Sequence, residues 1–181
     1  FRQLRHNTVQ GLLRRMDAHG IDRAVVSSIN GILYKNPHAS NEELDEETRA
    51  HRDRLVPFAT LKPNYPGWEE DLRRCAEDMG FRGIRLYPQY HGYALTDPES
   101  LQLIDAVTER AWPVQVPMRV VDRRQRHEWD LARDLEPEEF EAAISARPQT
   151  GWMVLEGIGL DALRLPGEAR YLVELSRLTS V

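Results

Sequence analysis

Several residues suited to chemistry directly follow a short apolar run, 112–121 (WPVQVPMRVV). Arg119 lies near the end of that run, and more arginines follow it. Guanidinium groups bind carboxylates and phosphates through paired hydrogen bonds, so Arg119 is a candidate substrate contact. Asp122 and His127, a few residues further on, have the residue types of a proton-transfer pair. A solvated charged loop is the alternative interpretation of the same stretch.

A second group of candidates accompanies the run 81–87 (FRGIRLY). Arg85 lies within the run and Tyr87 ends it. His91 follows among aromatic residues, where a histidine acts as a proton carrier or contacts a substrate. The alternative is an ordinary histidine of a surface loop. We treat Arg85, Tyr87 and His91 as candidate substrate contacts.

The third group comes from the last part of the chain. Glu156 ends the apolar run 152–158 (WMVLEGI), and a buried carboxylate without a partner is costly. Glu156 is therefore expected near water or paired with a cation, and either environment suits a catalytic residue. Glu174 and Arg177, in and after the run 171–175, are further candidate substrate contacts.

Composition narrows the class of protein. The chain has 181 residues with a formal net charge of -5, which gives no electrostatic reason to expect a nucleic acid or an anionic membrane as partner. The expected partner is a small-molecule substrate, and homo-oligomers remain open. Cys75 is the only cysteine, which favours a reducing compartment such as the cytoplasm, and its helix position predicts a buried, inert thiol.

The elements that must position these residues follow one repeated pattern: an amphipathic helix, a Gly or Pro stop, and a short apolar strand. Strands that alternate with helices predict parallel β-α-β units and an α/β fold. No G-x-G-x-x-G or P-loop motif announces an open nucleotide-binding sheet, so a (β/α) barrel is preferred. The expected strands are 21–29, 55–61, 81–87, 112–121, 152–158 and 171–175. The expected helices begin at Thr8, at Ser40 or Asn41 (running to Arg54), near Trp68, at Asp97, at Pro137 and near Leu160.

Six phrases in this order resemble the amidohydrolase-related (amidohydrolase 2) family: GIDRAVVSS, HRDRLVPFATLKP, GFRGIRLYPQYHGY, WPVQVPMRV, WMVLEGIG and YLVELSRLTSV. The resemblance implies a (β/α)8 TIM-like barrel, of which strands two to seven, about six β/α units, are present. Residues 1–181 would then be one partial barrel domain that lacks the first and last strands, and we expect the native protein to be longer, or the missing parts to be disordered or removed. It also implies a divalent metal, zinc or manganese, and hydrolysis of a C–N or C–O bond in a small, polar, anionic substrate.

The sequence departs from the family pattern at three metal-site positions. Pro117 stands where strand five usually carries a histidine, and Arg85 stands where some binuclear members carry a carboxylated lysine. Glu156 falls near the histidine position of strand six and is the candidate metal ligand within this chain. Three functions therefore stay open: a hydrolase, a metal-dependent decarboxylase in which Arg119 anchors the carboxylate, and a non-catalytic barrel that has lost its metal.

Overall fold

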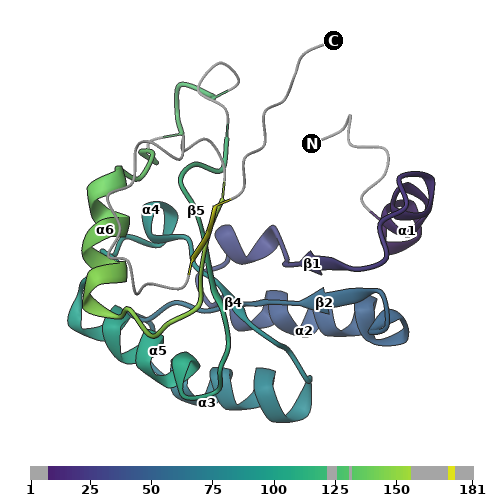
Figure 1. Ribbon diagram of the computed structural model, residues 1–181, viewed down its shortest axis with the longest axis horizontal. Helices are drawn as coiled ribbons and strands as arrows, with labels where there is room; N and C mark the ends of the chain where they lie inside the picture. Colours follow the sequence, from purple (N-terminus) through teal and green to yellow (C-terminus); the bar gives the residue numbers. More distant parts are fainter. Residues whose placement is uncertain (1–7, 122–125, 131, 156–170, 174–181) are drawn as a thin grey trace.

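A computed structural model describes residues 8–121, 126–130, 132–155 and 171–173 of the chain. Short parallel strands alternate with helices along these residues (Figure 1). The strands are β1 (Ala24–Val26), β2 (Leu55–Pro57), β3 (Ala59–Thr60), β4 (Ile84–Arg85), β5 (Val114–Pro117), β6 (Trp152–Leu155) and β7 (Tyr171–Val173). The helices are α1 (Val9–Ala18), α2 (His38–Thr48), α3 (Trp68–Arg73), α4 (Pro88–His91), α5 (Pro98–Thr108) and α6 (Pro137–Ala146).

Within each of two sheets, every described strand pairs in parallel with the next one along the chain. Strands β3, β4, β5, β6 and β7 form one sheet in that order, and β1 pairs with β2. The two sheets meet at Phe58, whose N–H donates to the Val26 carbonyl at 2.8 Å, whereas the next N–H, of Ala59, donates to Gly83 at 2.9 Å. One extended stretch thus pairs with β1 through its first half and with β4 through its second half. This is the strand order of a (β/α) barrel, of which the described strands form a part.

Helices α3, α5 and α6 lie around the outside of the strands (Figure 1). Their apolar side chains join those of the strands in one buried cluster, in which Leu103 of α5 and Phe140 of α6 accompany Ile84 and Val114. None of these four side chains has measurable exposure. The cluster therefore fixes which face of the sheet looks outward, and residues one position along each strand must face the opposite way.

Local sequence signals explain where two of the helices begin. The Thr8 side chain accepts a hydrogen bond from the Gly11 N–H at 3.1 Å and so caps α1, as the sequence predicts. Helix α6 starts with a reciprocal capping box between Glu136 and Glu139, followed by a proline at its first position.

No helix in the described part of the chain is long and apolar enough to span a bilayer.

The predicted alternation of helices and strands is confirmed, but the bounds differ. Strands β1, β4 and β5 are shorter than their apolar runs, and 55–61 is divided into β2 and β3 because the pairing partner changes at Phe58. Helix α2 begins at His38, before Ser40, and ends at Thr48, after which a 3-10 turn covers Arg49–His51 instead of helix to Arg54. The four-residue helix α4 was not predicted. The predicted helix near Leu160 lies outside the described residues.

Candidate functional site

The inner face of the sheet carries a row of polar side chains. Ala59, Ile84 and Val114 are register partners that face the apolar cluster. The next register partners, Thr60, Arg85 and Gln115, therefore share the opposite face, and we call these three residues the inner row. They lie on three neighbouring strands at or near the carboxyl ends, which is where barrel enzymes place their active sites.

Arg85 is the charged member of the inner row. Its Nη1 donates to Ser27 Oγ at 3.4 Å, just past the end of β1. Its guanidinium carbon lies 5.3 Å from the centre of the Tyr87 ring, and Tyr87 is itself buried. The Nε atom of Arg85 is inaccessible to solvent, and no group in the described part of the chain forms a hydrogen bond with it. The structure therefore brings Arg85 and Tyr87, two of the predicted substrate contacts, together on the inner face.

The other two members of the inner row were not predicted. Gln115 is 6% exposed and Thr60 is fully buried, and the residues that the structure describes offer no hydrogen-bond partner to Gln115 Oε1 or to Thr60 Oγ1. Buried polar atoms nearly always form hydrogen bonds. Unpaired polar atoms at neighbouring register positions therefore indicate a place where a hydrogen-bonding group is missing. A glutamine between two valines in WPVQVP was the sequence signal that could have identified Gln115.

His91 is buried, and it is neither a surface histidine nor part of the inner row. Its Nε2 lies 2.9 Å from the Gly31 carbonyl oxygen, and because a carbonyl only accepts, Nε2 carries the hydrogen. Its ring lies between Tyr87 and Tyr93, with centroids 6.0 Å and 6.3 Å away. Burial, and secondly the charge of Lys62, lowers the pKa of His91. His91 thus ties the segment after β4 to the segment after β1, and its contact with substrate stays a prediction.

The segment after β5 is held by ion pairs among its own residues. Arg119 is half-buried directly after β5. Arg126 pairs with Asp134 at 2.6 Å and lies 3.8 Å from Asp130. The Tyr90 hydroxyl donates to Asp130 at 3.1 Å, and burial together with this carboxylate raises the pKa of Tyr90 to about 12. Arg126 is therefore engaged within the loop, and the role of Arg119 as an anion contact stays a prediction.

His127 is exposed on the same segment. Its Nδ1 accepts a hydrogen bond from the Trp129 N–H at 3.2 Å, and the two rings are 5.3 Å apart. Its predicted partner, Asp122, lies outside the described residues, so the proton-transfer pair stays a prediction. The predicted roles of Glu156, Glu174 and Arg177 also fall on residues outside the described part of the chain.

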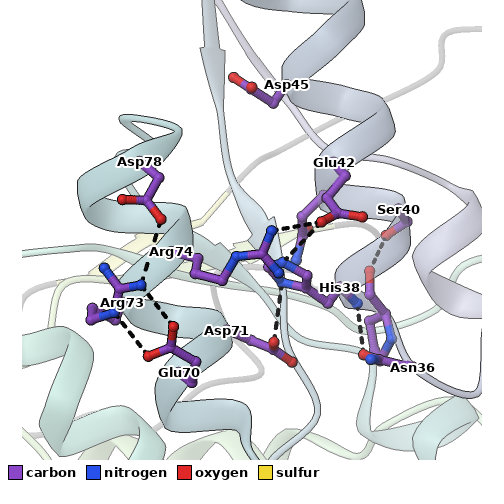
Figure 2. Close-up of polar contacts among 12 residues, drawn as sticks. Asn36, His38, Ser40, Glu42, Asp45, Glu70, Asp71, Arg73, Arg74 and Asp78 are labelled. Carbon is purple, nitrogen blue, oxygen red and sulfur yellow. Dashed lines mark hydrogen bonds and ion pairs between the residues drawn. The ribbon is translucent and has the colours of Figure 1, made fainter.

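A further polar cluster joins α2 to α3, away from the inner row (Figure 2). His38, which carried no readable signal in the sequence, is 4% exposed, with Nδ1 3.3 Å from Asp71 and Nε2 3.7 Å from Glu42. Glu42 also pairs with Arg74 at 2.7 Å. Burial raises the pKa of Asp71, against the lowering effect of the His38 and Arg74 charges. These contacts link two helices of the outer layer.

The described residues do not supply a metal site. Among them, no three His, Cys, Asp or Glu side chains come together in a way that could hold a metal ion. Pro117, at the position where the family resemblance implies a histidine, offers no ligand from its side chain, and its carbonyl accepts from Gln89 Nε2 at 3.0 Å. In this part of the chain the inner face therefore presents a guanidinium and neutral polar groups.

Comparisons with known proteins agree on a family and a fold. A family model described as amidohydrolase matches residues 3–145. The fold is similar to that of 2,6-dihydroxybenzoate decarboxylase from Rhizobium, with a TM-score of 0.61, 19% identity, and coverage of 82% of this chain and 56% of that one. A comparison with curated proteins finds no match.

Two further solved structures share the fold. A 5-carboxyvanillate decarboxylase from Novosphingobium aromaticivorans, complexed with manganese, has a TM-score of 0.59 and 20% identity, over 80% of this chain and 48% of that one. A 4-oxalomesaconate hydratase from Rhodopseudomonas palustris has a TM-score of 0.56 and 18% identity, over 81% of this chain and 47% of that one. The chain thus spans about half the length of the structures that it matches.

Proposed function

Because this chain belongs to the amidohydrolase family, we propose that the whole protein is an enzyme that hydrolyses a C–N or C–O bond in a small anionic substrate. The substrate lies at the carboxyl ends of the strands, against the inner row. The observation that carries this proposal is the position of Arg85, a half-buried guanidinium on the inner face with an unpaired Nε. A buried cation with an unpaired donor favours an anionic ligand.

The proposed roles follow the order of the strands. Arg85 and Arg119, at β4 and after β5, bind the anionic group, and Tyr87 forms a wall beside it. His91 contributes by fixing the segment after β4, and Glu174 and Arg177 complete the substrate contacts. Glu156, with Asp122 and His127, handles protons. The family resemblance implies zinc or manganese, but the described residues do not supply its ligands, so no step is assigned to a metal.

The test is turnover by the full-length protein on carboxylate-bearing esters, lactones and amides, with and without added zinc or manganese. We expect hydrolysis, and we expect Arg119→Gln to lower kcat/KM for the anionic substrates by about 10- to 100-fold, since a charge-assisted hydrogen bond is lost. Arg110→Gln, which removes an exposed arginine at the end of α5, is the control and should leave kcat/KM unchanged. Absence of turnover across the whole panel would contradict the proposal.

Decarboxylation of an aromatic or unsaturated acid is the second candidate. Arg85 lies over the Tyr87 ring, an arrangement that suits a flat acid, and proteins of the same fold include two decarboxylases of aromatic acids. Incubating the full-length protein with ¹³C-carboxyl-labelled acids separates the two reactions, because only decarboxylation releases labelled CO₂ or bicarbonate. An acid that binds but is not turned over by either reaction would support a non-catalytic barrel.

A further inference from the structure

Three unpaired polar atoms lie side by side on the inner face. Arg85 Nε, Gln115 Oε1 and Thr60 Oγ1 are each inaccessible to solvent and without a hydrogen-bond partner among the described residues. Their Cα atoms are register partners across three adjacent strands, so the side chains project from neighbouring positions on one face. Isolated unpaired atoms are found in many proteins, but three in one register row point to a missing common partner.

The contacts of Arg85 define what that partner must offer. One end of the guanidinium is used by Ser27, and the guanidinium carbon lies 5.3 Å from the centre of the Tyr87 ring. The Nε edge remains, and this edge donates two nearly parallel hydrogen bonds to a carboxylate. No carboxylate of the described residues forms an ion pair with Arg85, whereas Arg126, which is also half-buried, pairs with Asp134 at 2.6 Å.

Gln115 and Thr60 add hydrogen-bonding groups beside Arg85 without cancelling the positive charge of its guanidinium. The two ends of a glutamine amide are interchangeable by rotation, so the unpaired atom of Gln115 can be presented as a donor to an anion. A hydroxyl such as that of Thr60 donates equally well. A neutral amide beside an arginine keeps the positive charge available, whereas a glutamate at the same place would neutralise it.

We propose that the inner row, Thr60, Arg85 and Gln115, is a subsite for the carboxylate group of a flat acid. The Nε edge of Arg85 donates to both carboxylate oxygens and the Gln115 amide donates to one of them, with the Thr60 hydroxyl beside them and Tyr87 against the acid. This inference rests on the proposed function, which places the substrate here, and it goes further by naming the group that is recognised and the residue, Gln115, that keeps Arg85 available.

The first experiment measures binding and needs no turnover. Full-length protein is titrated by calorimetry with benzoate and with benzamide, its neutral counterpart of the same shape. Benzoate is expected to bind about 10- to 100-fold more tightly, because hydrogen bonds to a charged group are the stronger ones. Equal affinity for the two ligands, or no binding of benzoate, would overturn the subsite.

Variants locate the interaction. Gln115→Glu places a carboxylate beside Arg85, so benzoate binding should fall at least about tenfold while the melting temperature stays the same or rises. Arg85→Lys keeps the charge but loses the paired donors and should weaken benzoate by a similar factor. Arg82→Gln removes an exposed arginine just before β4, and it should bind benzoate like the original protein. Unchanged benzoate affinity in a folded Gln115→Glu protein would exclude the subsite.

The two proposals fail in distinguishable ways. Benzoate binding that depends on Gln115, without turnover of any panel substrate, would uphold the subsite and overturn the proposed reaction. Turnover of anionic substrates with kcat/KM unchanged in Gln115→Glu would uphold the reaction and overturn the subsite.

Discussion

At the scale of single residues, Cys75 shows how burial decides reactivity. Its side chain has no exposed surface, and burial raises the pKa of the thiol to about 12. The predicted burial of Cys75 is confirmed. The thiolate is the nucleophilic form of cysteine, so a buried thiol with a raised pKa is expected to be unreactive. We expect no labelling of Cys75 by a disulfide reagent at pH 8 in the native protein, and rapid labelling in concentrated urea.

The same burial has a consequence for stability at high pH. The native state holds the thiol protonated, so its contribution to the free energy of unfolding is complete below pH 9 and is lost as the pH rises toward about 12. Urea denaturation at pH 8 and pH 10, on this protein and on Cys75→Ala, measures that contribution. Fast native-state labelling at pH 8, or an identical pH dependence in the variant, would contradict the prediction.

Residue type and strand position predicted only part of the candidate site. Arg85, Tyr87 and Arg119 could be named because they lie at or near the ends of apolar runs, and barrel chemistry gathers at strand ends. Gln115 and Thr60 could not, because their importance depends on register, which pairs residues far apart in the sequence. The burial of His91 was missed for a related reason, since its partner is the carbonyl of Gly31 in another loop.

At the scale of elements, the side chain of Asn41 makes backbone hydrogen bonds of the kind that a neighbouring strand would make. Where β1 ends, the fully buried Asn41 of α2 accepts from the Thr60 N–H at 2.8 Å and donates to the Thr60 carbonyl at 2.9 Å. Asn41→Ala leaves both backbone groups unpaired, and we expect a loss of about 2–4 kcal/mol in the free energy of unfolding, measured with urea.

Asn64→Ala is the matched control for this prediction. Asn64 is exposed, and its amide makes only long contacts of 3.3 Å and 3.4 Å to the carbonyls of His91 and Gly92. Its loss should cost under about 0.5 kcal/mol. A similar cost for both variants would show that Asn41 is not a substitute for a strand.

The approach of two strands explains a glycine in the phrase GFRGIRLY. A Cβ on Gly83 would lie 2.5–2.7 Å from atoms of the Phe58 ring, at the residue where the pairing partner changes. Gly83→Ala should therefore destabilise the fold by about 1–3 kcal/mol, measured by thermal and urea denaturation, and adding Phe58→Leu should recover part of this loss. Gly151→Ala, whose nearest atoms are 3.8 Å away, should change stability by less than about 0.5 kcal/mol. Additive costs in the double variant would refute the clash.

Element type was more predictable than element extent. Helices such as α1 and α5 carry long apolar stripes and clear start signals, and both were located from the sequence. Helix α4 was missed because four residues are too few to show a period. The strands were predicted too long because an apolar run continues past the last ladder hydrogen bond, as 81–87 does around β4.

At the scale of the whole molecule, alternating helices and strands predicted a (β/α) barrel, and the parallel strands in chain order confirm the part that is described. The family resemblance is likewise confirmed over residues 3–145. The sequence could not identify the reaction. One fold hosts many different functions, and these depend on the side chains of the site. The fold does not identify the reaction either, because this chain shares it with decarboxylases and with a hydratase.

The strand order also bears on how the protein is made. From β3 to β6, each strand pairs with the next strand to be synthesised, as Ile84 does with Val114, so none of them waits for a distant part of the chain. At roughly 5–20 residues per second on the ribosome, that interval is a matter of seconds. The sheet can therefore assemble strand by strand as the chain emerges, with the most recent strand always the exposed edge that the next one covers.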